Sequence, residues 1–213
     1  MKSGDRLEVQ RRIRVADGWL LLQLDFHVPE ALDDLPRLGV TIPLPHGFEK
    51  LHFYGRGPHE NYWDRHAGTR VGLYHQTVAG QYFPYVMPQE TGNRTDVRMI
   101  AVDNGEVGLM AVGAGMLLEA SALHFTPQDL FDAHHINELA PRRETFLNLD
   151  IHQRGLGTAT CGEDTTPSCR IHAGNHRLAL RLVPYDARTT DLMVLARHFA
   201  DWTSREGQSG PQS

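Results

Sequence analysis

Carboxylates and arginines gather in two short segments that are rich in aromatic residues. Glu60, Asp64 and Arg65 lie in the first segment, and Glu90 and Arg94 lie in the second. Sugar-binding sites combine aromatic faces with carboxylates and arginines that hydrogen-bond hydroxyl groups, and a glycosidase works with a pair of carboxylates. The same residue types also form ion pairs inside a domain, where an arginine clamps a carboxylate. From residue types alone, this scaffold role is the favoured interpretation.

Other motifs that could indicate a catalytic or binding site are weaker. The run Gly55-Arg56-Gly57-Pro58 is superficially similar to a dinucleotide-binding loop, but its third glycine is missing and no helix follows. The chain contains no GxSxG nucleophile elbow. His172 and His176 flank Gly174-Asn175 between two alternating segments, which predicts a hairpin turn and not a zinc-binding helix face. No set of three well-spaced ligands stands out, so we expect no metal site.

The composition is that of an ordinary globular protein. The 213 residues suit one domain or two small ones, and 40% of them are hydrophobic and 22% charged. A formal net charge of −5 argues against a general nucleic-acid binder and against a protein of anionic membranes. No apolar run is long enough to span a bilayer. Cys161 and Cys169, in a chain with no signal segment, predict reduced thiols in the cytoplasm.

Strands must position these residues, because apolar residues recur at every second position along much of the chain. Leu20, Leu22, Leu24, Phe26 and Val28 alternate with polar residues, as in a half-buried strand. Similar patterns predict nine strands, at 20–28, 38–44, 50–54, 96–102, 108–112, 116–123, 145–151, 168–172 and 177–183. Short strands separated by turn residues indicate an all-β sandwich or barrel.

Helix signals are few. Thr126-Pro127 predicts a short helix that ends near residue 133, and apolar residues at helical spacing predict a helix over 189–203. We therefore expect a β-sandwich domain over 1–188, this C-terminal helix, and a disordered polar tail over 204–213. The stretch 55–87 is rich in glycine, proline and aromatic residues without a regular period. Long structured loops of this kind are often functional.

Three motifs carry a resemblance to one enzyme family. The run Gly55-Arg56-Gly57-Pro58-His59-Glu60-Asn61-Tyr62-Trp63-Asp64-Arg65 resembles the signature GxGPxENYxDR of the C-terminal domain, or small chain, of glycoside hydrolase family 2 β-galactosidases. The block Tyr82-Phe83-Pro84-Tyr85-Val86-Met87-Pro88-Gln89-Glu90-Thr91-Gly92-Asn93-Arg94 is also similar to that family. A third run, at 147–157, is similar to its LNID…GxG segment. Their order and spacing agree, and the resemblance covers residues 17 to 185.

The resemblance implies a large antiparallel β-sandwich of the galactose mutarotase-like supersandwich type, in agreement with the strand pattern. It also implies that a separate (β/α)₈ barrel, absent from this chain, carries Mg²⁺ and two catalytic glutamates that cleave the glycoside with retention. We therefore expect no catalytic residue and no cofactor in this chain. Its expected role is to complete the sugar pocket of a barrel-bearing chain or domain that acts on β-galactosides such as lactose, and to be inactive alone.

In that family, a loop just after the GxG segment closes one side of the sugar pocket, and in some members it carries a tryptophan. The matching loop here has no tryptophan, and Cys161 matches its position best, with Gly162 one gap away. Cys161 would then be a smaller pocket wall, or an apolar filler between strands. We predict substrate contacts at Cys161, Gly162, Glu163, Glu90 and Arg94. We assign a structural role to the motif residues Gly57, Pro58, Glu60, Asn61, Tyr62, Asp64 and Arg65.

Two departures from the family leave alternatives open. The family domain usually begins some tens of residues earlier, so this chain is a truncated product, a split-gene fragment, or one that pairs with the missing part. The C-terminal helix also lies beyond the matched segment. A stand-alone mutarotase-like aldose epimerase would need a general acid and a general base, with candidates His52, His59, His75 and Glu90. A non-catalytic carbohydrate-binding module and a homo-oligomer are further alternatives.

Overall fold

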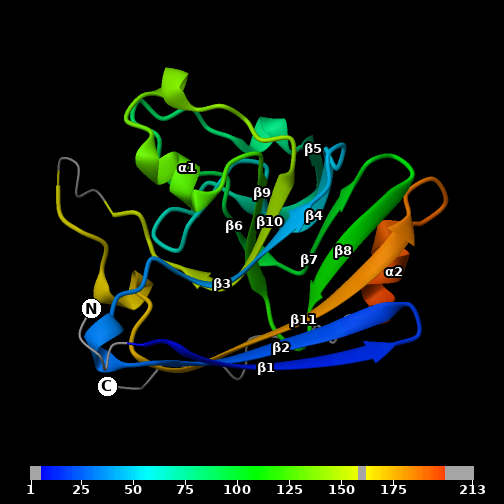
Figure 1. Ribbon diagram of the computed structural model, residues 1–213, viewed down its shortest axis with the longest axis horizontal. Helices are drawn as coiled ribbons and strands as arrows, with labels where there is room; N and C mark the ends of the chain where they lie inside the picture. Colours follow the sequence, from blue (N-terminus) through cyan, green and yellow to red (C-terminus); the bar gives the residue numbers. More distant parts are fainter. Residues whose placement is uncertain (1–5, 158–161, 200–213) are drawn as a thin grey trace.

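Two antiparallel β-sheets pack face to face (Figure 1). The computed structural model describes residues 6–157 and 162–199. The larger sheet has the strand order β1-β2-β11-β8-β7-β4-β5, and the smaller sheet has the order β3-β10-β9-β6. This arrangement confirms the predicted antiparallel β-sandwich.

The strands are β1 (Glu8–Ala16), β2 (Trp19–Val28), β3 (Arg37–Leu44), β4 (Lys50–Gly57), β5 (Arg70–Thr77), β6 (Arg94–Val97), β7 (Met99–Asp103), β8 (Val107–Gly113), β9 (Leu118–Leu123), β10 (Thr145–Gln153) and β11 (Gly174–Asp186). The α-helices are α1 (Pro127–Asp132) and α2 (Leu192–Phe199), and short 3₁₀ turns lie at Glu30–Leu32, Ala79–Gln81, Ile136–Glu138 and Pro167–Cys169. Neither α-helix of the described chain is long and apolar enough to cross a membrane.

The core lies between the sheets. Because side chains alternate along a strand, every second residue of each strand points into this core. Leu22, Leu24 and Phe26 of β2 are buried against Leu147 and Leu149 of β10 in one continuous cluster. The clean alternation of β2 therefore arises because its inner face is buried while its outer face is only partly covered. Strand β10, in contrast, is largely buried on both faces. Burial of each such side chain contributes about 1.5–3 kcal/mol to folding.

Helix α2 packs on the opposite face of the larger sheet. Met110 and Val112 of β8 join a second cluster with Ala196 of α2, whereas Ala111 between them belongs to the central core. Successive residues of a strand point to opposite faces, so α2 covers the outer face. Predicted helix residues 200–203 and the tail 204–213 lie outside the described residues.

The structure corrects two strand predictions and one turn prediction. The expected strand 96–102 is split into β6 and β7, which belong to different sheets. Asp96 has a φ of 53°, in the left-handed region, and this turns the chain between the sheets. Residues 168–172 do not form a strand: Pro167–Cys169 is a 3₁₀ turn, and only Ile171 makes a bridge, to Leu35. His172 and His176 therefore do not flank a hairpin turn.

Two strands, β1 and β5, were not expected from the sequence. They are the outermost strands of the larger sheet. Strand β1 is exposed on both faces, and Arg11 interrupts its inward-facing apolar residues. Strand β5 is exposed on one face and only partly buried on the other. Strand β5 lies inside the stretch 55–87, whose remainder forms the irregular segments that carry the first and second motifs.

Candidate functional site

The loop after β10 is held by one carboxylate of the first motif. Asp64 Oδ2 accepts hydrogen bonds from the Gly157 amide at 2.7 Å and from Thr165 Oγ1 at 2.9 Å. Its Oδ1 accepts from the Leu156 amide at 3.2 Å. Asp64 thus joins both ends of the segment that contains the predicted pocket loop, and the first and third motifs meet there. A carboxylate that accepts several amide bonds is a strong anchor.

Two glycines make this anchor possible. A Cβ at Gly155 would lie 2.6 Å from Asp64 Oδ2 and 2.5 Å from Thr165 Oγ1. Gly157 has a φ of +64°, and a Cβ there would lie 2.6 Å from the Thr165 amide nitrogen. A side chain at either position would displace the loop from Asp64, which explains the spacing of the GxG segment.

Glu60 joins the first motif to the second. Its Oε1 accepts from Arg65 Nη2 at 2.6 Å and from the hydroxyl of Tyr85. Its Oε2 accepts from the Gly92 amide at 2.8 Å and from Thr91 Oγ1 at 3.0 Å. Because both oxygens are occupied by donors of this chain, Glu60 acts as a structural clamp.

Asn61 and Arg94 lie beneath these contacts and are buried. Asn61 Oδ1 accepts from the Thr95 amide at 2.9 Å. Arg94 Nη1 donates to the Gly92 carbonyl and Nη2 to the Pro58 carbonyl, each at 3.0 Å. Burial lowers the pKa of Arg94 to about 10. The Arg94 guanidinium thus holds together the segments of the first and second motifs through their backbone carbonyls.

A tight turn presents Asp64. The Tyr62 amide donates to the Arg65 carbonyl at 3.1 Å, and the Arg65 amide donates back to Tyr62 at 2.8 Å. Tyr62 is fully buried, and this burial raises the pKa of its hydroxyl. Gly57 precedes the turn, where a Cβ would lie 2.9 Å from the Tyr74 ring. The predicted structural residues of the first motif therefore lie in one connected framework.

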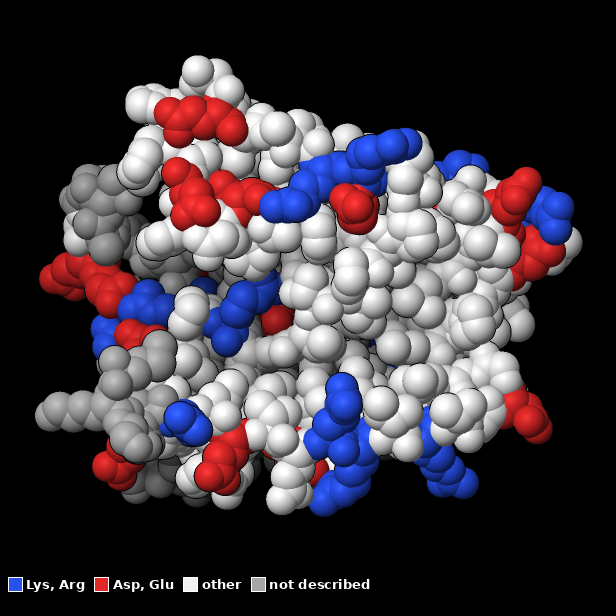
Figure 2. Space-filling model, in the orientation of Figure 1, with Lys and Arg blue, Asp and Glu red and all other residues white. Residues whose placement is uncertain are grey.

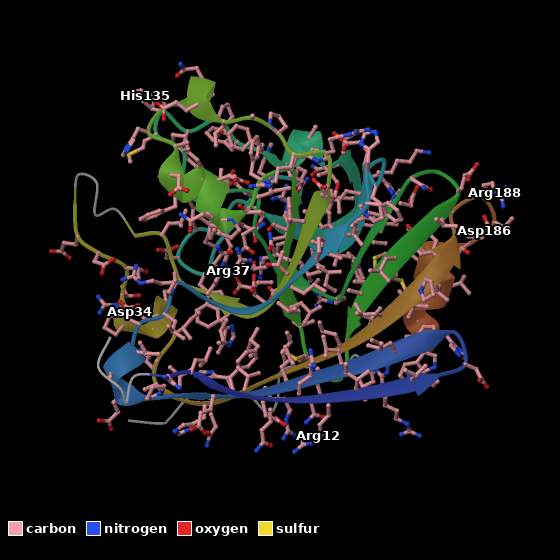
Figure 3. The ribbon with its side chains drawn as sticks, in the orientation of Figure 1. Arg12, Asp34, Arg37, His135, Asp186 and Arg188 are labelled. Carbon is pink, nitrogen blue, oxygen red and sulfur yellow. The ribbon has the colours of Figure 1, made fainter. Side chains whose placement is uncertain are left out.

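Glu90 takes part in an ion-pair network around Arg37. Arg37 Nη2 lies 2.5 Å from Asp150 Oδ2, and Arg37 Nη1 lies 3.4 Å from Glu90 Oε2. Burial raises the pKa of Asp150 to about 6, although Arg37 opposes this shift. Figure 3 shows Arg37 at the end of the sandwich where the loop after β10 emerges.

A second ion-pair network fixes the far side of that loop. Arg154 Nε lies 2.6 Å from Asp34 Oδ1, and Arg154 Nη2 lies 2.6 Å from Asp164 Oδ2. Asp34 is also labelled in Figure 3, at the same end of the molecule. Arg170 Nη2 adds a contact to Asp164 at 3.3 Å. The segment is thus pinned on both sides, by Asp64 and by these arginines.

A cavity of about 440 Å³ opens between the anchor and the loop. Asp64, Arg65, Gly157 and Glu163 are among the residues that line it. Of the predicted substrate contacts, Glu163 therefore faces this cavity, and the neighbouring Gly162 is exposed. Cys161 lies outside the described residues.

Glu90 and Arg94 do not line this cavity. Arg94 lies at a second cavity of about 370 Å³, together with Glu60, Phe83 and Tyr85. The structure thus places Glu163 at the first cavity and Arg94 at the second. Substrate contact remains a prediction for all five of the residues proposed for it.

Sequence reasoning missed several buried or half-buried polar groups at this end of the sandwich. Arg37 stands in a predicted strand flank, and Glu119 looks like an ordinary strand residue. Glu119 is buried and accepts from Asn93 Nδ2 at 2.9 Å, and burial raises its pKa to about 8. The His152 ring packs against Trp63 with ring centroids 4.0 Å apart. Asp150 and His152 had a signal, because both belong to the third motif.

Charges of both signs are interspersed on the face seen in Figure 2, so no broad patch of one sign marks a polyanion-binding surface there. Within residues 6–157 and 162–199, no group of three or more His, Cys, Asp or Glu side chains is placed to hold a metal ion. Cys169 is a free cysteine.

Comparisons with known proteins agree with the three motifs. The family model described as "Beta galactosidase small chain" matches residues 5–182. The β-galactosidase of Priestia megaterium is 32% identical over 141 residues, which are 66% of this chain and 14% of that protein. The β-galactosidase of Vibrio cholerae is 35% identical over 146 residues, 66% of this chain and 13% of that protein. The chain thus matches a small part of these relatives' length.

Among solved structures, a putative aldose 1-epimerase from Escherichia coli K12 aligns with a TM-score of 0.45 and 10% sequence identity, over 84% of this chain and 60% of that chain. The family model, in contrast, spans every strand from β1 to most of β11 and includes all three motifs. The chain therefore belongs to the β-galactosidase small chain family.

Proposed function

We propose that this chain is the C-terminal domain or small subunit of a β-galactosidase, and that it completes the sugar pocket of a (β/α)₈ barrel on another chain or domain. The observation that carries the proposal is the Asp64 anchor, which fixes the ends of the loop after β10 beside a cavity. The proposed substrates are terminal β-D-galactosides such as lactose, and the proposed location is the cytoplasm.

The proposal assigns the chemistry to the barrel. A retaining glycosidase needs one carboxyl group as acid and base and a second as nucleophile, both in contact with the sugar. In the described part of this chain, Glu90 and Asp150 both bind Arg37, and donors of the chain occupy both oxygens of Glu60. We therefore propose that the isolated chain does not hydrolyse galactosides, and that the catalytic glutamates and the Mg²⁺ ion lie in the barrel.

The alternative of a stand-alone epimerase is less well supported by the side-chain arrangement. His52 Nδ1 lies 2.6 Å from His75 Nδ1, and His52 Nε2 lies 2.9 Å from Asp103 Oδ2. Glu90 belongs instead to the network around Arg37. An epimerase needs its acid and base on one sugar, and these candidates lie in different networks.

The direct test is to assay the purified chain with a nitrophenyl β-galactoside, alone and with a barrel-bearing β-galactosidase chain from the same source. We expect no turnover by either chain alone and turnover by the mixture. Turnover by this chain alone, from a host without its own galactosidase, would contradict the proposal. So would a barrel-bearing chain whose activity does not change when this chain is added.

Replacement of the anchor tests how the domain contributes. Asp64→Asn keeps the size of the side chain but removes the charge and one acceptor from the three bonds that hold the loop. Bonds to a charged group contribute about 1.5–3 kcal/mol each. We expect kcat/KM of the assembled enzyme to fall about tenfold or more, mainly through a higher KM.

Asp132→Asn is the matched control, because Asp132 is an exposed carboxylate at the end of α1. We expect this variant to keep the activity of the unmodified enzyme. Urea denaturation of both variants separates a loosened loop from an unfolded domain. Equal kcat/KM for the two variants would show that the anchored loop does not serve the sugar pocket.

A further inference from the structure

The inner, apolar face of the larger sheet extends beyond the area that the smaller sheet covers. Residues that pair directly across β11, β2 and β1 share the inner face. Along this face the exposed fraction is 0% for Leu180 in β11 and 9% for Leu22 in β2, and it rises to 53% for Ile13 and 47% for Val9 in β1. The inner face of β1 is therefore a continuation of the core that the smaller sheet does not reach.

The smaller sheet ends beside this uncovered face. Its outermost strand, β3, pairs with β10 along one edge only. The inward-facing Val40 and Ile42 of β3 are only partly buried, although they alternate with the same period as Leu38 and Leu44. An edge of this kind presents unpaired backbone donors and acceptors, which an added strand can satisfy.

A groove of about 640 Å³ runs between β3 and the β1–β2 hairpin, and Val9, Ile13, Leu22, Leu24 and Val40 line it together with Arg11. Among the described residues that line the groove, Arg11 is the single charged one. It forms no ion pair within the described part of the chain. In contrast, Arg12 points away from the sandwich in Figure 3 and pairs with Asp25 at 2.7 Å.

We propose that an extended segment from the barrel-bearing part of the β-galactosidase adds as a strand to the free edge of β3 and fills this groove. The segment would carry apolar residues at alternate positions, facing β1 and β2, and an Asp or Glu opposite Arg11. Backbone pairing satisfies the β3 edge, apolar burial covers Val9 and Ile13, and the carboxylate neutralises Arg11. This inference rests on the proposed function, which supplies the partner.

Charge and chain length favour this occupant over a second copy. Strand β1 carries three arginines and one glutamate, so β1 of a second copy laid in the groove would set like charges against Arg11. The relatives are much longer than the chain, because the matched part is 14% of the Priestia protein. They therefore have ample sequence outside the matched region to supply a strand.

Charge reversal on the two faces of β1 tests the proposal. Arg11→Glu reverses the groove charge, whereas Arg14→Glu makes the same change on the opposite face of the same exposed strand. The affinity of each variant for the barrel-bearing chain is measured by titration. We expect Arg11→Glu to weaken binding at least tenfold, and Arg14→Glu to change the affinity by less than about twofold.

Hydrogen–deuterium exchange of the unmodified chain, alone and in the complex, gives a second readout that does not depend on a variant. We expect the amides of β3 and β1 to exchange at least tenfold more slowly in the complex. A complex that hydrolyses galactosides but shows equal affinities for the two variants and no protection of β3 overturns this inference and leaves the proposed function intact.

Two other results would also overturn the proposal of an added strand, and each can be distinguished from the result just described. If no complex forms and the mixture is inactive, the proposed function itself fails. If the chain alone is a dimer in solution with β1 and β3 protected, the groove is filled by a second copy.

Discussion

At the scale of single residues, the buried carboxylates near the loop after β10 differ in how their charge is balanced. Asp150 has the guanidinium of Arg37 at 2.5 Å. Glu119 has the amide of Asn93 at 2.9 Å and His152 at 4.0 Å, but no arginine or lysine salt bridge within the described residues. Burial therefore dominates for Glu119 and raises its pKa to about 8.

This raised pKa predicts a specific pH dependence of stability. The folded pKa of Glu119 is about 8 and its ordinary value is 4.5, so between these values the folded state binds more protons than the unfolded state. The free energy of unfolding must then fall as the pH rises through this range. A pKa difference of one corresponds to about 1.4 kcal/mol. We expect Glu119→Gln to be more stable than the unmodified chain at pH 8–9, and close to it at pH 5.

Urea denaturation at a series of pH values measures this effect. Glu106→Gln is the matched control, because Glu106 is exposed and its replacement should leave the pH profile unchanged. The charge of Asp150 also raises the pKa of Glu119, so the difference between the two profiles reports Glu119 together with its interaction with Asp150. If Glu119→Gln and Glu106→Gln give parallel profiles, Glu119 is charged in the folded protein at neutral pH and the prediction is wrong.

The structural part of the site was predictable from the sequence where the motifs are local. Glu60 and Arg65 are five positions apart and form the expected ion pair. The partners of Asp64 were not predictable, because Gly157 and Thr165 lie about a hundred positions away and nothing in their types marks them as donors to it. The same distance hid the contact between Arg37 and Asp150.

At the scale of elements, strand prediction succeeded for strands with an apolar pattern, including β8, β9 and β10, which are largely buried on both faces, and it missed the outermost strands β1 and β5. Strands β2, β3 and β11 alternate clearly and were found. Strand β1 also alternates, but Arg11 stands at an inward position where an apolar residue is expected, and this breaks the pattern. The division between β6 and β7 depends on the backbone of Asp96, whose positive φ has no signature in the hydrophobic pattern.

Helix α2 offers a prediction at this scale. Asp191 Oδ1 accepts from the Met193 amide at 2.9 Å and the Val194 amide at 3.1 Å, so it caps the helix. Loss of such a cap costs about 1 kcal/mol. We expect Asp191→Ala to lower the free energy of unfolding by about this amount and Asp191→Asn to restore most of it, both measured by urea denaturation. No change in the alanine variant would mean that α2 unfolds independently of the sheet.

At the scale of the whole molecule, the larger sheet is assembled from both ends of the described chain. Strand β11 lies between β2 and β8: residues 174–182 pair with β2, and residues 180–186 pair with β8. Its Leu178 and Leu180 are fully buried in the central core. The last strand thus completes the larger sheet, whereas α2 packs on the outer face of that sheet.

Two truncations test this difference. A chain that stops after Ala173 lacks β11, which leaves β2 and β8 without a shared neighbour, and we expect it to be unfolded by far-ultraviolet circular dichroism. A chain that stops after Ala187 keeps every strand and loses α2, and we expect it to fold with reduced stability, because Met110 and Val183 lose their cover. A folded product from the shorter chain would show that β11 is not needed to close the sheet.

The late position of β11 also has a consequence during synthesis. Strand β2 ends at Val28 and β11 begins at Gly174, so a ribosome that adds roughly 5–20 residues per second takes about 7–30 s to supply the neighbour of β2. Throughout that interval the edge of β2 that pairs with β11 lacks its partner strand on the nascent chain. We expect this unpaired edge to be a place where a chaperone can bind during translation, and slower synthesis to lengthen the interval in which nascent chains can aggregate.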